Sequence, residues 1–335
     1  SEKGLRGSKE AFSESVKMNT ALIRKRIRNA KMKAEEKQVG RYSATTTALL
    51  YLDGVVYQPI CEEMRKRLNA FEVDGIEDSG MIEYLTRKKK EGRFPVYQTT
   101  ERPDRAAQAI LEGRVVLLTD NSPEALIFPA TLNSLFQTAD DYYRNERIVT
   151  FLRLIRYVAA FLALALPGLY VAAATFHPQL LPGNLIRSMA EARSGVPFPT
   201  AAEVLLMELS FELLREAGLR MPGPAGNTIG IVGGLIVGQA AVSANLVSPI
   251  TVTVAALTAL GSFSIPNEEL SEVFRLWKYG ILLLGSCFGI LGVMLGCFLL
   301  LMLMAEQESY GIPWLYPYVG GNLNERSRRP SGLRK

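Results

Sequence analysis

Charged side chains that could do chemistry gather in one mostly apolar segment, residues 200–219. Glu208, Glu212 and Arg215 interrupt its leucines and its single phenylalanine. At 100° per residue these three side chains share one face of a helix, which therefore carries a polar stripe. An ionised group at mid-bilayer costs about 3 kcal/mol on insertion scales, so the stripe cannot face lipid. Two interpretations stay open. The helix lies at the membrane interface with Glu212 and Arg215 paired, or its acidic stripe borders a water-filled path, where carboxylates favour cations.

More polar side chains follow in a run without charge. The 47 residues between Arg220 and Glu268 contain no Asp, Glu, Lys, Arg or His. About a quarter of the residues of a soluble domain are charged, so this run indicates a membrane. Its amides and hydroxyls can hydrogen-bond between helices, which is the commoner role, or line a pore. With the two glutamates above, the pore-lining candidates are Gln239, Ser243, Asn245, Glu208 and Glu212.

Glycines recur at helical spacing in two apolar segments. They are four residues apart in the first segment, and four, three and four apart in the second. On a helix such glycines form a ridge without side chains, which lets another backbone approach closely, as in small-xxx-small membrane packing. The predicted packing positions are Gly226, Gly230, Gly234 and Gly238 in the first segment and Gly285, Gly289, Gly292 and Gly296 in the second.

No set of residues predicts an enzyme. His177 is the single histidine, and Cys61, Cys287 and Cys297 stand far apart in the sequence. The sequence shows no nucleophile with a base at a recognisable spacing and no phosphate-cradling glycine loop. We therefore expect no catalytic residues, no cofactor and no metal site. Because no recognition motif accompanies the basic residues, we also expect no binding of nucleic acid.

The lengths of the apolar runs predict about four membrane spans. About 20 apolar residues cross the hydrocarbon core, and the candidate runs are residues 157–176, 224–247, 249–266 and 279–305. Arginines precede the first span and the C-terminal tail is basic, so both ends of the chain should be cytoplasmic. An even number of crossings then makes the acidic helix interfacial or re-entrant. A fifth span would place the basic tail outside.

The charged first half of the chain predicts a small α/β domain. Strands are expected at residues 44–52, 114–119 and 124–128, and helices at 8–37, 59–71, 79–90 and 103–112. The predicted fold class is a membrane protein in which a small cytoplasmic α/β domain is followed by an α-helical transmembrane domain. Its parts are a basic helical N-terminal segment (1–41), the cytoplasmic α/β domain (42–150), the transmembrane helical domain (151–306) and a basic cytoplasmic tail (307–335).

Short segments along nearly the whole chain resemble one protein family. They include Thr100-Glu101-Arg102-Pro103-Asp104, Thr175-Phe176-His177-Pro178 and Gly195-Val196-Pro197-Phe198-Pro199, together with residues 6–12, 19–24, 111–115, 151–157, 208–218 and 230–241. So many matches in order are far more specific than any single one. On these segments the chain resembles the A-subunit family of bacterial spore germinant receptors, the GerA and GerK type.

The resemblance implies a multi-pass protein of the spore inner membrane, with both termini on the spore core side. It implies a homo-oligomer that contacts membrane lipid and receptor B and C subunits and forms a nutrient-gated cation channel. Two alternatives stay open: a non-conducting membrane scaffold, and an accessory paralogue of the SpoVAF type that supports the dipicolinic acid release channel. Family members usually carry another soluble subdomain before the Arg6-Gly7 segment, so we expect a fragment or a shortened paralogue.

Overall fold

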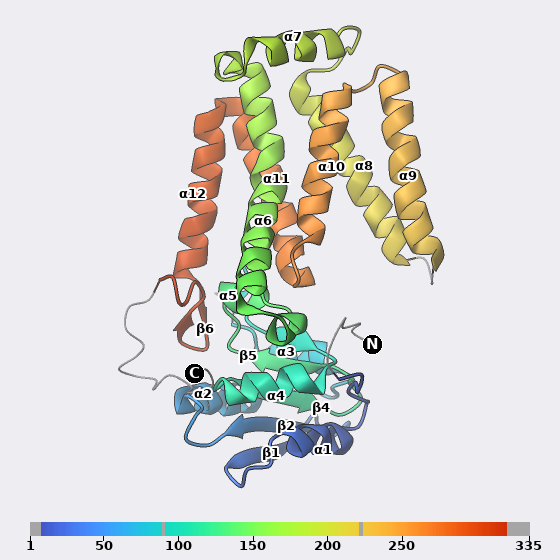
Figure 1. The fold of residues 1–335 in the computed structure, drawn as a ribbon. Coiled ribbons are helices and arrows are strands. Elements are labelled where there is room, and N and C mark those ends of the chain that lie inside the picture. Colours follow the sequence, from blue (N-terminus) through green and yellow to red (C-terminus); the bar gives the residue numbers. More distant parts are fainter. Residues whose placement is uncertain (1–7, 89–90, 221–223, 320–335) are drawn as a thin grey trace. The chain divides into compact units, whose positions relative to one another are not determined.

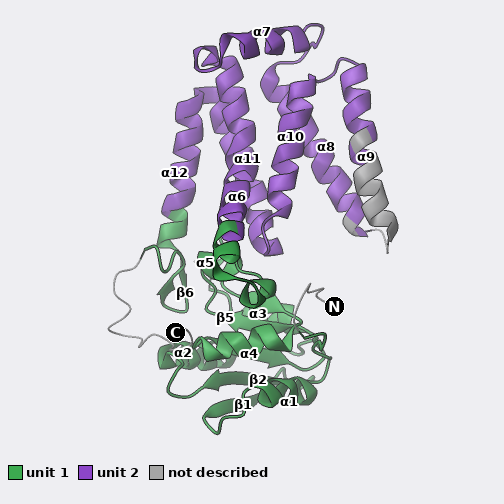
Figure 2. Cartoon of the chain, viewed as in Figure 1, with its two compact units in different colours: residues 1–151, 303–335 green, residues 152–302 purple. Residues whose placement is uncertain are grey.

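The chain divides into two compact units. The structure, a computed structural model, describes residues 8–88, 91–220 and 224–319, although not the side chains of residues 219, 224–232 and 235. One unit consists of residues 1–151 and 303–335, and the other of residues 152–302 (Figure 2). The second unit is thus an insertion in the sequence of the first.

Five antiparallel strands form the sheet of the first unit, in the order β1-β2-β4-β5-β3 (Figure 1). They are β1 (Met32–Val39), β2 (Thr45–Leu52), β3 (Gln98–Thr100), β4 (Val115–Thr119) and β5 (Ala125–Phe128). Alternate side chains of a strand point to opposite faces. On β2, Leu49 and Tyr51 therefore enter one core, whereas Leu50 and Leu52 enter another. Because both faces are buried, the central strands are continuous apolar runs.

Helices cover both faces of this sheet, which makes three layers. α2 (Gln58–Asn69) and α3 (Ser79–Thr86) bury Met64 and Ile82 on one face. α1 (Val16–Arg26) and α4 (Pro103–Leu111) bury Ile23 and Ile110 on the other. A short helix, α5 (Leu132–Leu135), and a 3-10 helix (Ala139–Tyr143) lead out of the sheet. The α/β class predicted for this half of the chain is confirmed.

The helix predicted from Ser8 to Lys37 is correct only over Val16–Arg26, because residues 8–15 are not helical and the second half contains a strand. Helix α1 ends at Arg26, and residues 32–39 form the edge strand β1, paired with β2 along its whole length. This strand contains Met, Ala, Glu, Lys and Gln, which favour helices in isolation. Pairing with β2 overrides that preference, and charged side chains are common on edge strands because they discourage pairing with other chains.

The residues after the last helix return to the core of the first unit. β6 (Glu308–Ser309) and β7 (Ile312–Pro313) form a short hairpin. Tyr310, at its tip, is 3% exposed and lies in the same core as Tyr97. Trp314 is fully buried and donates its indole N–H to the Pro95 carbonyl (2.8 Å). The predicted basic tail thus begins with residues that complete a core, and its last residues, 320–335, lie outside the described chain.

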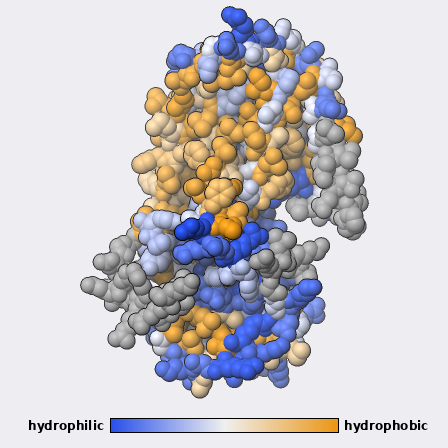
Figure 3. Space-filling model, viewed as in Figure 1, coloured by the Kyte–Doolittle hydropathy of each residue, from blue (hydrophilic) through white to orange (hydrophobic). Residues whose placement is uncertain are grey.

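The second unit consists of helices. They are α6 (Glu146–Thr175), α7 (Gly183–Ala192), α8 (Thr200–Arg220), α9 (Pro224–Ser243), α10 (Pro249–Phe263), α11 (Glu268–Phe288) and α12 (Ile290–Glu306); α6 and α12 extend into the first unit. Hydrophobic residues cover most of the face of this unit seen in Figure 3. On α12, for example, Leu291, Met294 and Phe298 are each more than half exposed. Such a surface is suited to lipid or to other protein chains.

In the part of the chain that the structure describes, one helix, α6, is long and apolar enough to cross a bilayer. It begins eleven residues before the predicted span 157–176 and continues through Pro167. Helices α10 and α12 are shorter and apolar. The number of membrane spans therefore stays a prediction.

The span predicted at residues 279–305 is wrong, because the chain reverses at Gly289. This glycine has φ +62° and its N–H donates to the Gly285 carbonyl, which ends α11. Positive φ is easily adopted only by glycine. After it α12 turns back against α11, so closely that a Cβ atom on Gly292 would collide with the Leu284 carbonyl. No charge marks this reversal in the sequence, so hydropathy alone predicts one long helix.

Candidate functional site

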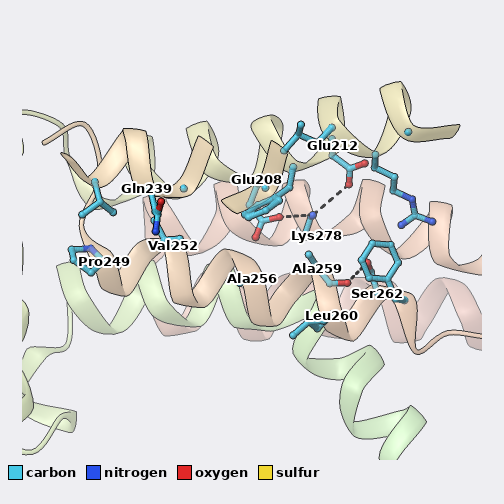
Figure 4. Close-up of a pocket in the computed structure, with 18 of the residues that line it drawn as sticks. Glu208, Glu212, Gln239, Pro249, Val252, Ala256, Ala259, Leu260, Ser262 and Lys278 are labelled. Atoms are coloured by element: carbon cyan, nitrogen blue, oxygen red, sulfur yellow. Dashed lines mark hydrogen bonds and ion pairs between the residues drawn. The ribbon is translucent and has the colours of Figure 1, made fainter. Parts of the chain in front are cut away.

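A groove of about 1190 Å³ lies in the helical unit, lined by residues of α8, α9, α10 and α11 (Figure 4). Phe211, Val242 and Val252 are among the apolar residues of its walls. The described charged residues that line it are Glu208, Glu212, Arg215, Glu268 and Lys278. A largely apolar cleft with a few converging polar groups is the usual form of a binding site.

The centre of the groove is a buried ion pair between α8 and α11. Lys278 Nζ lies 2.6 Å from Glu208 Oε2, with side chains that are 6% and 2% exposed. The same ammonium lies 3.6 Å from Glu212 Oε1, so it stands between two carboxylates (Figure 4). Its nitrogen is also 4.9 Å from the centre of the Tyr279 ring. Removing one member of such a pair costs about 3–5 kcal/mol, because the other charge is left buried and alone.

The pairing of Glu212 with Arg215, expected for a helix at the interface, is wrong. Glu212 instead accepts a hydrogen bond from Arg275 on α11, with 2.7 Å between Nη1 and Oε2. The Arg215 guanidinium lies 5.2 Å from the centre of the Phe263 ring, a cation–π distance. The polar stripe of α8 is therefore neutralised by the neighbouring helix α11 and not within α8 itself.

One oxygen of Glu208 has a free acceptor position. Among the described residues none donates a hydrogen bond to Oε1, although the atom is buried and the residue is 1% exposed. The Thr258 hydroxyl is beside this carboxylate, but it gives its proton to the Val254 carbonyl (2.9 Å). A buried acceptor without a donor costs about 1–3 kcal/mol, so it marks a place where an ion, water or ligand would bind favourably.

Glu203, the first glutamate of α8, has a structural role. It is fully buried, and it accepts hydrogen bonds from the Ser248 backbone N–H (2.9 Å), the Thr251 hydroxyl (3.0 Å) and Arg193 Nε (3.1 Å). Ser248 is the N-cap of α10, and the positive end of a helix dipole favours a carboxylate. The Glu203 carboxylate already has its hydrogen-bond donors, so we assign to it a role in holding the helices together.

Four of the five pore-lining candidates border the groove. Gln239 and Ser243 of α9 line it with Glu208 and Glu212. In Figure 4 Gln239 lies toward the end marked by Pro249 and Val252, away from the ion pair. Asn245 lies beyond the end of α9, exposed and with φ 53° in the connection to α10. Their role as pore residues stays a prediction.

The glycines predicted to pack have different surroundings. A Cβ on Gly238 would lie 3.3 Å from Val252 of α10, and one on Gly234 would lie 3.5 Å from Phe211 of α8. On the other side of the unit, a Cβ on Gly296 would lie 2.8 Å from Ile281, where α12 meets α11. The surroundings of Gly226 and Gly230, in the first part of α9, lie outside the described residues.

Sequence reasoning missed Arg275 and Lys278, because they lie between the predicted spans 249–266 and 279–305, where no helix was expected. They belong to α11, whose N-cap Asn267 accepts from the Leu270 N–H (2.9 Å). Asparagine followed by two glutamates is a helix-start signal. Basic residues three apart within such a helix share a face. The pattern was therefore present in the sequence.

Residues 1–329 match the model of the family described as "Bacillus/Clostridium GerA spore germination protein". The chain is 40% identical over 314 residues to "Uncharacterized membrane protein YfkQ" of Bacillus subtilis (strain 168), a match that covers 94% of this chain and 61% of that protein. It is 39% identical over 316 residues to "Spore germination protein A1" of the same organism, covering 94% and 66%. The chain thus spans less than two thirds of the length of these relatives.

A solved structure also matches part of the chain. It is the crystal structure of the N-terminal domain of the A subunit of the Bacillus megaterium spore germinant receptor GerK3. The match has 33% sequence identity and a TM-score of 0.29, and it covers 37% of this chain and 98% of that one.

Proposed function

Because the chain belongs to the Bacillus/Clostridium GerA spore germination protein family, we propose that it is the membrane subunit of a germinant receptor and that its helical unit forms the wall of a cation path. The proposed path lies in the spore inner membrane and opens when a nutrient is sensed. Receptor B and C subunits are the proposed partners, and several copies of this chain are proposed to assemble around the path.

The groove that carries Glu208, Glu212, Gln239 and Ser243 supports this function. Its described lining holds three carboxylates, with Glu268 as the third, against two basic side chains, Arg215 and Lys278. Carboxylates that line a path raise the local concentration of cations. The groove is bordered by helices of one copy, so a second copy or a partner subunit would complete its wall.

The test is potassium flux through liposomes that contain the full chain, alone and with its B and C partners. We expect flux with the wild type and a large loss with Gly234→Leu, because a leucine there would extend toward Phe211 and into the groove. Gly280→Leu is the matched control, since no described atom lies within 4 Å of a Cβ at that position. A correctly assembled oligomer without potassium flux would contradict the proposal.

A non-conducting scaffold is the second candidate, and the ion pairs favour it. Glu208 is paired with Lys278 and Glu212 with Arg275, so these four groups together carry no net charge. A scaffold needs such neutral, tightly packed helices and no open path. If Gln239→Trp and Ser243→Trp leave germination rates unchanged while the assembly persists, the scaffold is favoured over the channel.

A further inference from the structure

The position of one ammonium group suggests what the groove can bind. Lys278 Nζ is 2.6 Å from Glu208 and 3.6 Å from Glu212. An alkylammonium group resembles potassium or ammonium ions in size and charge, and it is bound by the same oxygen ligands. The two carboxylates therefore already hold one monovalent cation, which is covalently attached to α11 (Figure 4).

The carboxylate of Glu208 has more binding capacity than Lys278 uses. The lysine occupies Oε2, and within the described chain Oε1 receives no hydrogen bond although Glu208 is 1% exposed. Arg275 stays with Glu212 through its own 2.7 Å contact. If the ammonium left, Glu208 would therefore be the one acid of this group without a compensating charge.

We propose that Glu208, assisted by Glu212, is a binding site for a monovalent inorganic cation such as potassium, and that the ammonium of Lys278 occupies this site in the present state. When α11 withdraws Lys278, the ion takes its place. The inference deepens the proposed function, on which it rests: it names the residue that keeps cations out of the path and the site at which they enter. No bond is made or broken, and the net charge of the site is the same before and after the exchange.

The donor set fits a monovalent ion. The oxygens available are the two of Glu208, Oε1 of Glu212, and the lone pairs of the Thr258 hydroxyl beside them. Calcium requires six to eight oxygen ligands, usually with several carboxylates. Here one carboxylate is left uncompensated, so a single positive charge balances the site.

A thermal unfolding measurement on the full chain in lipid nanodiscs tests binding without relying on flux. Midpoints are compared in potassium chloride and in choline chloride of equal ionic strength. A ligand that binds only the folded state raises the midpoint. We expect no salt difference for the wild type, a higher midpoint in potassium for Lys278→Gln, and no difference for the double variant Glu208→Gln/Lys278→Gln.

Equal midpoints of Lys278→Gln in the two salts would overturn the proposal. Recovery of folded Lys278→Gln only in potassium would support it, whereas failure to fold in both salts would count against it, because the ion should replace the lost charge. Arg220→Gln is the matched control. It removes one positive charge from an exposed ion pair with Glu216 at the end of α8, and we expect no potassium-specific change.

Flux gives the second readout. Lys278→Gln should increase potassium flux without nutrient by roughly tenfold or more. The reason is that the Glu208 carboxylate attracts cations once the ammonium of Lys278 no longer occupies it. Glu208→Gln should decrease flux, since Lys278 then keeps its charge in the path beside Glu212. Wild-type flux from Glu208→Gln would overturn the inference and leave the proposed function standing. If the wild type conducts nothing, the proposed function fails, and the unfolding midpoints still decide whether the cation site exists.

Discussion

A Cβ atom on Gly285 would lie 3.0 Å from the carbonyl oxygen of Gly168, so α11 and α6 meet backbone to backbone. Val293 of α12 packs against the same site, and its side chain would lie 2.8 Å from that Cβ atom. Protein interiors are close-packed, so helices that approach this closely leave no room for an added side chain. This contact is therefore expected to contribute strongly to the stability of the helical unit.

We predict that Gly285→Val destabilises the helical unit by about 1–3 kcal/mol, the usual cost of overpacking. The measurement is the midpoint of thermal unfolding in nanodiscs. Gly280→Ala on the same helix is the control. A methyl group at Gly280 meets no described atom within 4 Å. Replacing a glycine inside a helix by alanine stabilises the helix by about 0.5–1 kcal/mol. Equal midpoints for the two variants would contradict the packing argument.

Glu203→Gln should also lower the stability of the helical unit. Three groups now donate hydrogen bonds to the Glu203 carboxylate. The glutamine amide would keep one acceptor oxygen, but its NH₂ group is a donor and would face at least one of these donors. Breaking such a buried charged network costs about 3–5 kcal/mol. Glu216→Gln, which removes an exposed charge of the same helix, should change the unfolding midpoint little. A similar effect of both variants would show that Glu203 has no special role.

Trp314→Ala should destabilise the first unit. Trp314 is fully buried, its ring centre is 4.9 Å from that of Phe94, and it donates a hydrogen bond to Pro95. Truncation of a buried tryptophan costs about 3–5 kcal/mol. Tyr84→Ala, at a site that is 79% exposed, is the control. Limited proteolysis of the full chain measures the effect, and we expect faster cleavage within residues 8–151 for Trp314→Ala alone.

Stability at acidic pH should depend on Glu35. Its pKa is lowered from 4.5 mainly by hydrogen bonds from Arg65, both at 2.8 Å, and also by the Tyr51 hydroxyl, although partial burial opposes this shift. A carboxylate with a lowered pKa stabilises the fold above its unfolded pKa and loses that effect as pH falls.

Glu35→Gln should therefore lower the free energy of unfolding at pH 7 by about 1 kcal/mol or less, because the pair is partly exposed. The difference from the wild type should shrink as the pH is taken below 4.5, the ordinary value for this side chain. Unfolding midpoints across pH 3 to pH 7 measure it, with exposed Glu36→Gln as the control. A difference that grows toward acid would contradict the assignment.

Most elements of the first unit were predictable from local patterns. Strands β2, β4 and β5 are apolar runs bounded by turn residues, and α4 begins at Pro103, which suits a first helical turn. The edge strand β1 was missed since its composition favours a helix and its partner β2 is a tertiary contact. The hairpin around Tyr310 was missed because burial of a C-terminal segment leaves no periodic signal.

The helical unit was less predictable, because hydropathy reports depth in a membrane and not the partners of a side chain. The acidic stripe of α8 was found from spacing alone. Its counterions Arg275 and Lys278 lie more than 60 positions later in the sequence. The chain reversal at Gly289 depends on one backbone angle, which a charge-free segment does not reveal.

The hairpin of residues 308–313 and Trp314 also constrain the order of biosynthesis. They complete the core of the first unit, yet they follow every helix of the second unit in the sequence. During translation the first unit therefore emerges with part of its hydrophobic interior uncovered until the helices of the second unit have been made. A chain that ends before residue 308 therefore lacks part of that core, however completely its first 151 residues have been made.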